Sequence, residues 1–392
     1  MNSSEACAWV RHARSSLAPI AALCAVGTGA GAADDRFILI ERDLTARSIT
    51  VLELDHRAAS IMNDSGVTES LPLDQCLLLL REAPLPAVEP RGKLILADGA
   101  HVPGTSVGCF AEPVDHVAWS HAWLGVIDVP LDRLRTMIIL PGATPEEGSS
   151  DTLRLRDGEK LEGFVLGIGR QVDFETRVQN ESRHVRVDLD RVESISFVAR
   201  PRPRVGRWAW FGDGTALEVR ALTFGSDGWV HLDGSWATPS ANAVQVGDLA
   251  GLAFAAERVV PLAQLRHAPL PAEPMRWRVP SPRLVTDGEP FGVETIELRG
   301  PLQVTYPMPD GATRFAAEFE LAPGSEQWGD LDLRIGAGTK ELSRAHLDAS
   351  NPVCTVNVPI DGASLEITLT AGAHAAIQDR VLVRRGMVLV GE

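Results

Sequence analysis

The sequence predicts an all-β protein made of four tandem small β-barrel-like repeats followed by a β-sandwich module. A six-residue pattern recurs four times, and apolar residues alternate with a period of two almost throughout, without a long helical period. The pattern reads LPLDQC from Leu71, VPLDRL from Val129, VDLDRV from Val187 and VQVGDL from Val244. Its aspartates Asp74, Asp132 and Asp190 are 58 residues apart, and Phe254 follows Phe197 by 57 residues. These spacings define units of nearly constant length.

Three of the four units begin with the same short pattern. Each has an alternating apolar run, then Asp-Gly, then a second run, in LILADGAHVPG, LRLRDGEKLEG and WAWFGDGTALEV. Asp-Gly between two such runs predicts a β-hairpin with a type I′ turn, in which both central residues have positive φ. The first unit has FILIERDLTARSITVLEL instead, which indicates a degenerate or differently turned hairpin.

The recurring six-residue pattern predicts one tight turn before the closing strand of each unit. The residue two positions after the aspartate is apolar or cysteine in the first three copies, which indicates that it points into the core. We expect the aspartate side chain to accept hydrogen bonds from nearby backbone N–H groups. The pattern would then recur because each unit has the same tight turn before its closing strand.

Pro-, Gly- and charge-rich stretches divide the chain. The predicted segments are a signal peptide (1–32), four repeats (34–82, 93–140, 152–199 and 207–258), a Pro-rich linker (259–290) and the C-terminal module (291–392).

The N-terminus has the features of an export signal. Arg11 and Arg14 precede the apolar run Leu17–Val26, and Ala30-Gly31-Ala32 fits an A-x-A cleavage site. We therefore expect a periplasmic, extracellular or cell-envelope location, with no membrane span after cleavage, because the apolar run is too short for a stable anchor.

Charge and cysteine content exclude some classes of function. A net charge of −15 argues against nucleic acid and anionic membranes as partners. Cys76, Cys109 and Cys354 remain after signal removal, enough for one disulfide but not for a disulfide framework. Cys76 occupies the inward position of the recurring pattern, which predicts a core residue.

Residues 34–258 resemble the tandem SH3-like or Sm-like small β-barrels of exported bacterial proteins. The resemblance lies in the head L-x-L-x-D-G-x-x-L-x-G and the tail V-x-L-D-R-V-x-x-I-x-F of the third unit. A four-bladed propeller is the alternative, because its blades also repeat at 40–50 residues. The Pro-rich stretches between the units favour separate barrels.

About residues 285–390 resemble the NPCBM family of carbohydrate-binding modules, which implies a galactose-binding-like jelly roll. The matching stretches are Gly311–Phe315, Leu331–Ile335 and Val356–Leu369. The family's closing Asp-His and following Trp are replaced by GAHAAIQDRVLV, in which His374 and Asp379 stand at a different spacing. The resemblance implies carbohydrate as a ligand.

Sugar sites combine an aromatic face with polar side chains that bind hydroxyl groups. Trp328 and Asp330 lie together in GSEQWGDLD, and His374 and Asp379 lie in the loop before the last strand. These four residues are the candidate carbohydrate-binding residues. The alternatives are that Trp328 caps the sandwich core and that His374, Asp379 and Arg380 are ordinary surface residues.

The fourth unit is rich in tryptophan, with Trp208, Trp210, Trp229 and Trp236. An exposed aromatic stripe would bind glycan rings or a protein, whereas a barrel of this size needs some of these side chains in its core.

The sequence contains no recognisable catalytic or metal-binding motif. Asp115, His116 and His121 lie close together, but no fourth ligand is apparent, and two loop histidines are the favoured interpretation. Glu146 and Glu147 fall in a linker, where no buried site would tune their pKa values. We expect no enzyme activity, no cofactor and no metal.

The function predicted from these features is non-enzymatic recognition of a polysaccharide or a glycan-bearing partner through the C-terminal module. The alternative is an envelope scaffold that binds other proteins and no small ligand. A diverged hydrolase would need a cleft with two carboxylates at catalytic separation.

Overall fold

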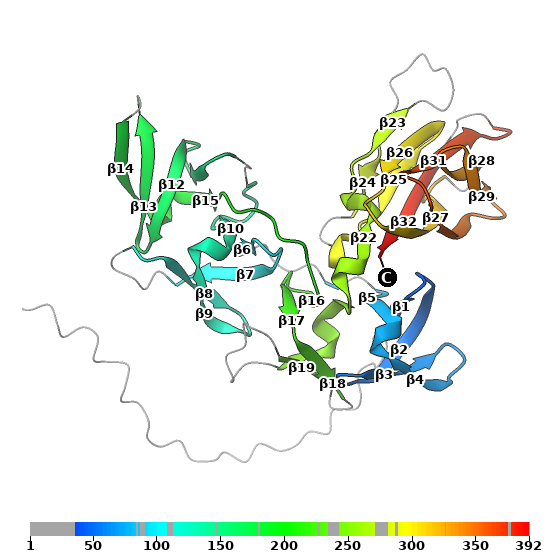
Figure 1. The fold of residues 1–392 in the computed structure, drawn as a ribbon, viewed down its shortest axis with the longest axis horizontal. Helices are drawn as coiled ribbons and strands as arrows, with labels where there is room; N and C mark the ends of the chain where they lie inside the picture. The colour runs from blue at the N-terminus through cyan, green and yellow to red at the C-terminus, as the bar shows by residue number, and fades with distance from the viewer. Residues whose placement is uncertain are drawn as a thin grey trace, which may run out of the picture. The chain divides into compact units, whose positions relative to one another are not determined.

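The computed structural model confirms an all-β protein (Figure 1). It describes residues 36–391 except 84, 87–90, 108–112, 146–147, 179–180, 226–227, 234–242, 271–280, 287–288, 326 and 375–377. The predicted signal peptide lies outside the described residues. Among the described residues, no helix is long and apolar enough to cross a membrane.

The first three repeats contain five strands each and the fourth contains six, and in every repeat the last strand returns to pair with the first. The first repeat contains β1 (Arg36–Glu41), β2 (Ala46–Leu54), β3 (Ala58–Asn63), β4 (Thr68–Pro72) and β5 (Cys76–Arg81). The second contains β6 (Gly92–Leu96), β7 (His101–Ser106), β8 (His116–His121), β9 (Gly125–Pro130) and β10 (Leu134–Ile138). The third contains β11 (Asp151–Leu155), β12 (Lys160–Ile168), β13 (Gln171–Val178), β14 (Glu181–Asp188) and β15 (Val192–Ser196). The fourth contains β16 (Arg207–Phe211), β17 (Ala216–Val219), β18 (Ala221–Phe224), β19 (Trp229–Asp233), β20 (Ala243–Gln245) and β21 (Leu249–Ala253), with β17 and β18 on either side of Arg220.

The Asp-Gly hairpins form, but the predicted type I′ turn is wrong. Gly99, Gly158 and Gly214 have positive φ, whereas the aspartates before them do not. Each aspartate instead accepts a hydrogen bond from the backbone N–H two residues later, at 2.9–3.0 Å. This bond mimics a backbone turn and explains why aspartate precedes the glycine.

The first repeat has the same hairpin turn with a different residue at the positive-φ position. Leu44 has a φ of 63° where the other repeats have glycine, and Asp43 accepts from the Thr45 N–H at 2.9 Å. Leu44 is buried, so its packing offsets the strain of a left-handed backbone.

The recurring six-residue pattern forms a 3₁₀ turn before each closing strand, as predicted. The turns are Leu73–Gln75, Leu131–Arg133, Leu189–Arg191 and Val246–Asp248. The residues that follow them, Cys76, Leu134, Val192 and Leu249, are buried. The expected aspartate bonds are wrong: in the described part of the chain, no backbone N–H donates to the side chain of Asp74, Asp132 or Asp190.

Backbone hydrogen bonds hold each 3₁₀ turn in the same way in all four repeats. At the start of the turn, the N–H of its first residue donates to the carbonyl of the residue that precedes the third strand of the repeat. In the second repeat this bond joins Leu131 to Asp115 at 2.9 Å, and in the fourth repeat β19 takes the place of the third strand. The carbonyl of the last turn residue accepts from the residue after the first strand, as in Ala97 to Arg133 at 2.9 Å. The equivalent bonds are Leu73–Arg57 and Arg42–Gln75 in the first repeat, Leu189–Arg170 and Arg156–Arg191 in the third, and Val246–Gly228 and Gly212–Asp248 in the fourth. The pattern recurs because this corner joins three parts of the repeat.

The repeats share sheets through their closing strands. In the first and fourth repeats β5 pairs antiparallel with β21, with Leu79 opposite Leu252. In the second and third repeats β10 pairs antiparallel with β15, with Met137 opposite Ile195. Within the described part of the chain, the repeats therefore join across their closing strands and do not close as separate barrels. This arrangement also differs from a propeller, whose blades do not share sheets in this way.

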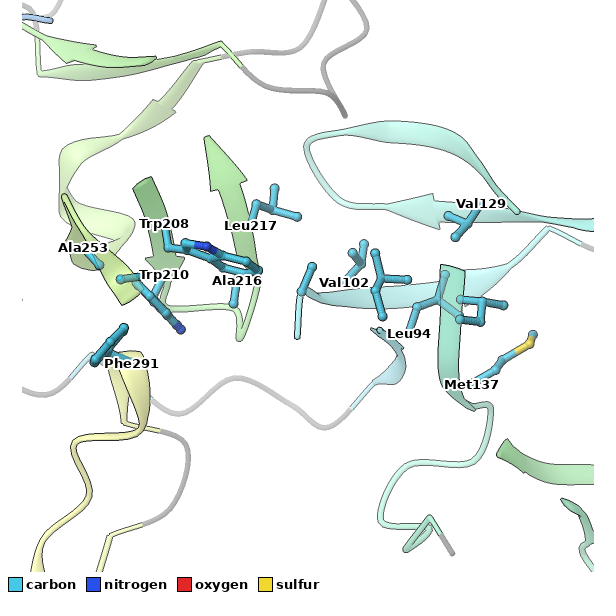
Figure 2. Packing of buried hydrophobic residues seen from close by; sticks show 14 of the residues in the cluster. Leu94, Val102, Val129, Met137, Trp208, Trp210, Ala216, Leu217, Ala253 and Phe291 are labelled. Carbon is cyan, nitrogen blue, oxygen red and sulfur yellow. The ribbon is translucent and has the colours of Figure 1, made fainter. Parts of the chain in front are cut away.

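The tryptophans of β16 lie in the core, where Trp208 is 1% exposed and Trp210 is 8% exposed. Figure 2 shows Trp210 beside Phe291, and the two rings make an edge contact with centroids 5.5 Å apart. The Arg204 guanidinium lies over both indoles at 5.4 and 5.7 Å. Core packing is therefore the role of these two tryptophans.

The C-terminal module is built from two sheets. One contains β24 (Arg283–Leu284), β25 (Ile296–Arg299), β32 (Arg380–Val390), β27 (Ala312–Leu321) and β30 (Val353–Pro359), with β22 (Val259–Pro261) paired to β32. The other contains β23 (Ala268–Leu270), β26 (Leu302–Pro307), β31 (Ser364–Ala371), β28 (Leu331–Ala337) and β29 (Lys340–Leu347). Buried residues of both sheets, among them Phe315, Phe319, Leu333 and Ile367, form one hydrophobic cluster.

Residues 259–290, expected to be a linker, contain β22, β23, β24 and the 3₁₀ turn Leu262–Gln264, and a further 3₁₀ turn, Pro290–Gly292, begins at their end. A further 3₁₀ turn, Ala256–Arg258, precedes them. The three strands pair with strands of the C-terminal module. Prolines are compatible with this arrangement, because Pro261 ends its strand and Pro269 lies on a strand at the edge of its sheet.

Candidate functional site

The four predicted carbohydrate-binding residues lie on two loops that contact each other. Trp328 and Asp330 are on the β27–β28 loop, and His374 and Asp379 are on the β31–β32 loop. The N–H of Gly372 donates to the Asp330 carbonyl at 2.8 Å, and the N–H of Ala373 donates to Asp330 Oδ2 at 3.0 Å. These bonds bring the two loops together.

Gly372 allows this close approach. A Cβ atom at this position would lie 1.9 Å from Asp330 Oδ1, so any larger residue would displace the carboxylate.

The indole of Trp328 is presented to solvent, with 45% of the residue exposed. Backbone bonds from the N–H groups of Trp328 and Gly329 to the Ser325 carbonyl, at 3.3 and 2.7 Å, form the turn that carries it. The exposed imidazole of His374 meets the indole edge to face, with centroids 5.8 Å apart and planes at 83°. Trp328 is therefore an exposed aromatic surface supported on one side.

An additional histidine joins the site from β29. His346 Nε2 lies 3.3 Å from Asp330 Oδ1, and its Nδ1 lies 3.1 Å from Asp332 Oδ1. Asp348 Oδ2 is 3.7 Å from the same Nε2. Sequence reasoning missed His346, Asp332 and Asp348, because alternation indicates the face of a strand but not its partner strand.

Asp379 lies beneath the loops and is 2% exposed. Burial is the main cause that raises the pKa of its carboxyl group to about 6; the Asp330 backbone opposes this rise and the Asp330 carboxylate adds to it. Within the described residues, neither carboxyl oxygen of Asp379 has a hydrogen-bond partner. Asp379 is therefore too buried to contact a ligand in this conformation. The Asp330 side chain is only 13% exposed and its Oδ1 is buried, so Trp328 and His374 are the predicted residues that are open to a ligand.

Arg380, which follows Asp379, pairs elsewhere. Its Nη2 lies 2.9 Å from Glu297 Oε2, and this hydrogen bond is the main cause that lowers the pKa of Glu297. Arg299 Nε is 2.5 Å from Glu297 Oε1. The three charges form a separate group on β25 and β32.

The remaining residues singled out in the sequence are the other tryptophans, the cysteines and the paired glutamates. Trp229 is 41% exposed, and Trp236, Cys109, Glu146 and Glu147 lie outside the described residues. Cys76 is buried, as predicted, and both Cys76 and Cys354 are free thiols.

His116 and His121 lie within strand β8, so their expected loop position is wrong. His121 is buried, with Nε2 2.8 Å from Thr215 Oγ1. Its Nδ1 accepts from the N–H groups of Trp123 and Leu124 at 3.3 and 3.2 Å. Burial lowers the pKa of His121, with Asp213 opposing this effect. In the part of the chain that the structure describes, no three His, Cys, Asp or Glu residues are grouped to hold a metal ion.

No protein-family model matches the chain, and no curated protein matches it. The solved structures similar to it include a CBM51 from Clostridium perfringens GH95 in complex with methyl-galactose. That structure is 12% identical with a TM-score of 0.28, and the match covers 33% of this chain and 99% of the other.

Two further solved structures extend this comparison. A family 6 carbohydrate-binding module is 12% identical with a TM-score of 0.21, and the match covers 34% of this chain and 93% of the module. The M60 catalytic domain with the CBM51-1 and CBM51-2 domains from Clostridium perfringens ZmpB is 8% identical with a TM-score of 0.29, and the match covers 91% of this chain and 51% of the other. Any functional assignment therefore rests on the residues of the site itself.

Proposed function

We propose that this chain is an exported, non-enzymatic binding protein that recognises carbohydrate through the Trp328 surface of its C-terminal β-sandwich. The observation that carries the proposal is the half-exposed indole of Trp328, supported by His374 beside Asp330. Aromatic faces of this kind pack against the C–H faces of sugar rings, while nearby polar groups bind hydroxyls.

The residues of the site have separate roles in this proposal. Trp328 supplies the stacking surface, and the exposed His374 ring supplies a hydrogen-bonding group at its edge. Asp330 holds the two loops together, because its Oδ2 accepts from the Ala373 N–H and its side chain is only 13% exposed. Asp379 acts through Asp330 as a positioning residue, because its carboxyl group is buried next to that side chain.

The proposal is tested by binding of the full chain to a panel of immobilised neutral polysaccharides. Trp328→Ala should weaken binding by at least about tenfold, the loss expected for a central aromatic contact. Trp229→Ala is the matched control, because Trp229 is similarly exposed but lies on β19 of the fourth repeat. The full chain is required, because a fragment beginning at residue 285 would lack β22, β23 and β24.

Two results would overturn the proposal. One is that the wild-type chain binds none of the polysaccharides. The other is that Trp328→Ala and Trp229→Ala bind as tightly as the wild-type chain.

A scaffold that binds other proteins is the second candidate function. It is favoured by the exposed apolar side chains Phe164 and Leu166, which alternate on one face of β12. In this case Phe164→Ser with Leu166→Ser would abolish association with a purified envelope partner, and Trp328→Ala would leave it unchanged.

A further inference from the structure

Two arginines face each other on the outer surface of the five-stranded sheet. Arg334 on β28 is the direct cross-strand partner of Arg344 on β29. The neighbours of Arg334 along β28, Leu333 and Ile335, are buried in the sandwich core, so Arg334 faces away from it. Both arginines are exposed.

The row of residues continues across the sheet with polar side chains. Thr368 on β31 is the cross-strand partner of Arg334, and Gln303 on β26 is the partner of Thr368. Two exposed guanidinium groups, the buried Thr368 and the amide of Gln303 therefore lie at the same level across four neighbouring strands.

The two arginines are not neutralised by the acidic side chains around them. Asp332, on the same strand, lies 3.1 Å from His346 Nδ1, and Glu366 Oε2 accepts from Gln303 Nε2 at 3.0 Å. Among the described residues, neither Arg334 nor Arg344 has an acidic partner within ion-pair distance. Like charges directly opposite each other destabilise a sheet. A pair of this kind in a chain with a net charge of −15 indicates a site for an external anion.

We propose that Arg334 and Arg344 bind the anionic groups of an acidic polysaccharide, either uronate carboxylates or sulfate esters. The planar donor fork of arginine matches both oxyanions. This inference rests on the proposed carbohydrate-binding function, and names the charge class of the ligand.

The position of the arginine pair relative to the Trp328 surface supports this assignment. The cross-strand pair Asp332–His346 lies two residues from the pair Arg334–Arg344 on the same strands and therefore on the same face. His346 in turn approaches Asp330, which precedes β28 by one residue. A glycan chain that follows β28 for about four residues, roughly 13 Å, would reach both the Trp328 surface and the arginine pair.

The test compares binding of the full chain to polygalacturonate, dextran sulfate and neutral dextran. Arg334→Gln and Arg344→Gln should each weaken binding of an anionic polymer by about tenfold. Lys340→Gln is the matched control. It removes one positive charge from the same hairpin, at a residue paired with Asp361 at 3.4 Å, and should change binding by no more than about twofold. Loss confined to polygalacturonate would identify uronate, and loss confined to dextran sulfate would identify sulfate esters.

Thermal unfolding gives a second readout that does not require a high-affinity ligand. Arg344→Gln should raise the unfolding midpoint of the unliganded protein, because it removes the repulsion between the two guanidinium groups. The bound anionic polymer should raise the midpoint of the wild-type protein more than that of the variant, because a ligand stabilises the state that binds it.

The inference is wrong if the wild-type chain binds neither anionic polymer, or if Lys340→Gln weakens binding as much as the arginine variants do. Its failure can be separated from that of the proposed function. If Trp328→Ala abolishes neutral glycan binding while the arginine variants bind both anionic polymers normally, only the anion site fails. If the arginine variants lose anionic polymer and no neutral glycan binds, the Trp328 site fails and the anion site stands.

Discussion

Asp379 combines burial with an acidic neighbour, and both effects favour its protonated form. Its pKa is raised to about 6 in the folded protein, above its ordinary value of 3.8. Below pH 3.8 the carboxyl group is protonated in both the folded and the unfolded state. As pH rises through about 6, the unfolded state has already released the proton, so the folded state loses stability.

Replacing Asp379 with asparagine should therefore stabilise the protein at neutral pH. The variant keeps a polar side chain but cannot ionise. The free energy of unfolding of the variant should exceed that of the wild type, and this difference should grow by on the order of 2 kcal/mol between about pH 4 and pH 7. Urea denaturation at both pH values measures this difference, and a gain that does not change with pH would contradict the assigned burial of the charge.

At the scale of single elements, the 3₁₀ turns show which part of the recurring six-residue pattern carries stability. The turn is held by backbone bonds at both ends, and among the described residues no backbone N–H donates to the Asp132 side chain. The apolar residue after the turn is fully buried, as in Leu134. We therefore attribute the repeated apolar position to core packing, whereas nothing in the structure explains the repeated aspartate.

Substitutions in the second repeat separate these two contributions. Leu134→Ala should lower the free energy of unfolding by about 2–5 kcal/mol, because it leaves a cavity in the core. Asp132→Ala should change it by less than about 0.5 kcal/mol, as expected for a surface position without a cap bond. Chemical denaturation of the full chain measures both values, and a large effect of Asp132→Ala would show that the aspartate bonds a backbone group after all.

At the scale of the whole molecule, the closing strands join repeats that are distant in sequence. The first and fourth repeats share a sheet through β5 and β21, and the second and third share a sheet through β10 and β15. Each closing strand is therefore hydrogen-bonded on both sides, which protects it from solvent and from pairing with other chains.

Hydrogen exchange tests this arrangement. Amides of Cys76–Arg81 and Leu249–Ala253 should exchange at least about tenfold more slowly than those of Thr68–Pro72, which pairs with β3 alone in the described residues. If the repeats were independent, β5 would be an edge strand on one side. Half of its amides would then exchange as fast as those of β4.

Much of the local structure followed from the sequence. Alternation and Asp-Gly turns predict the strands and hairpins, and the position of Cys76 in the recurring pattern predicts its burial. These features depend on neighbouring residues, whose φ/ψ preferences and side-chain period act over a few positions. The same local signals place Trp328 in a loop.

Only the tertiary structure decided which elements meet. A period of two assigns a side chain to a face of a strand, but the partner strand and its register depend on hydrogen bonds between distant segments. For this reason the sequence alone did not show that β5 pairs with β21, that His346 lies beside Asp330, or that Arg334 stands opposite Arg344. The chain by itself determined a repeated all-β architecture with an aromatic loop near its end, and the pairing of strands determined the charges and neighbours that surround that loop.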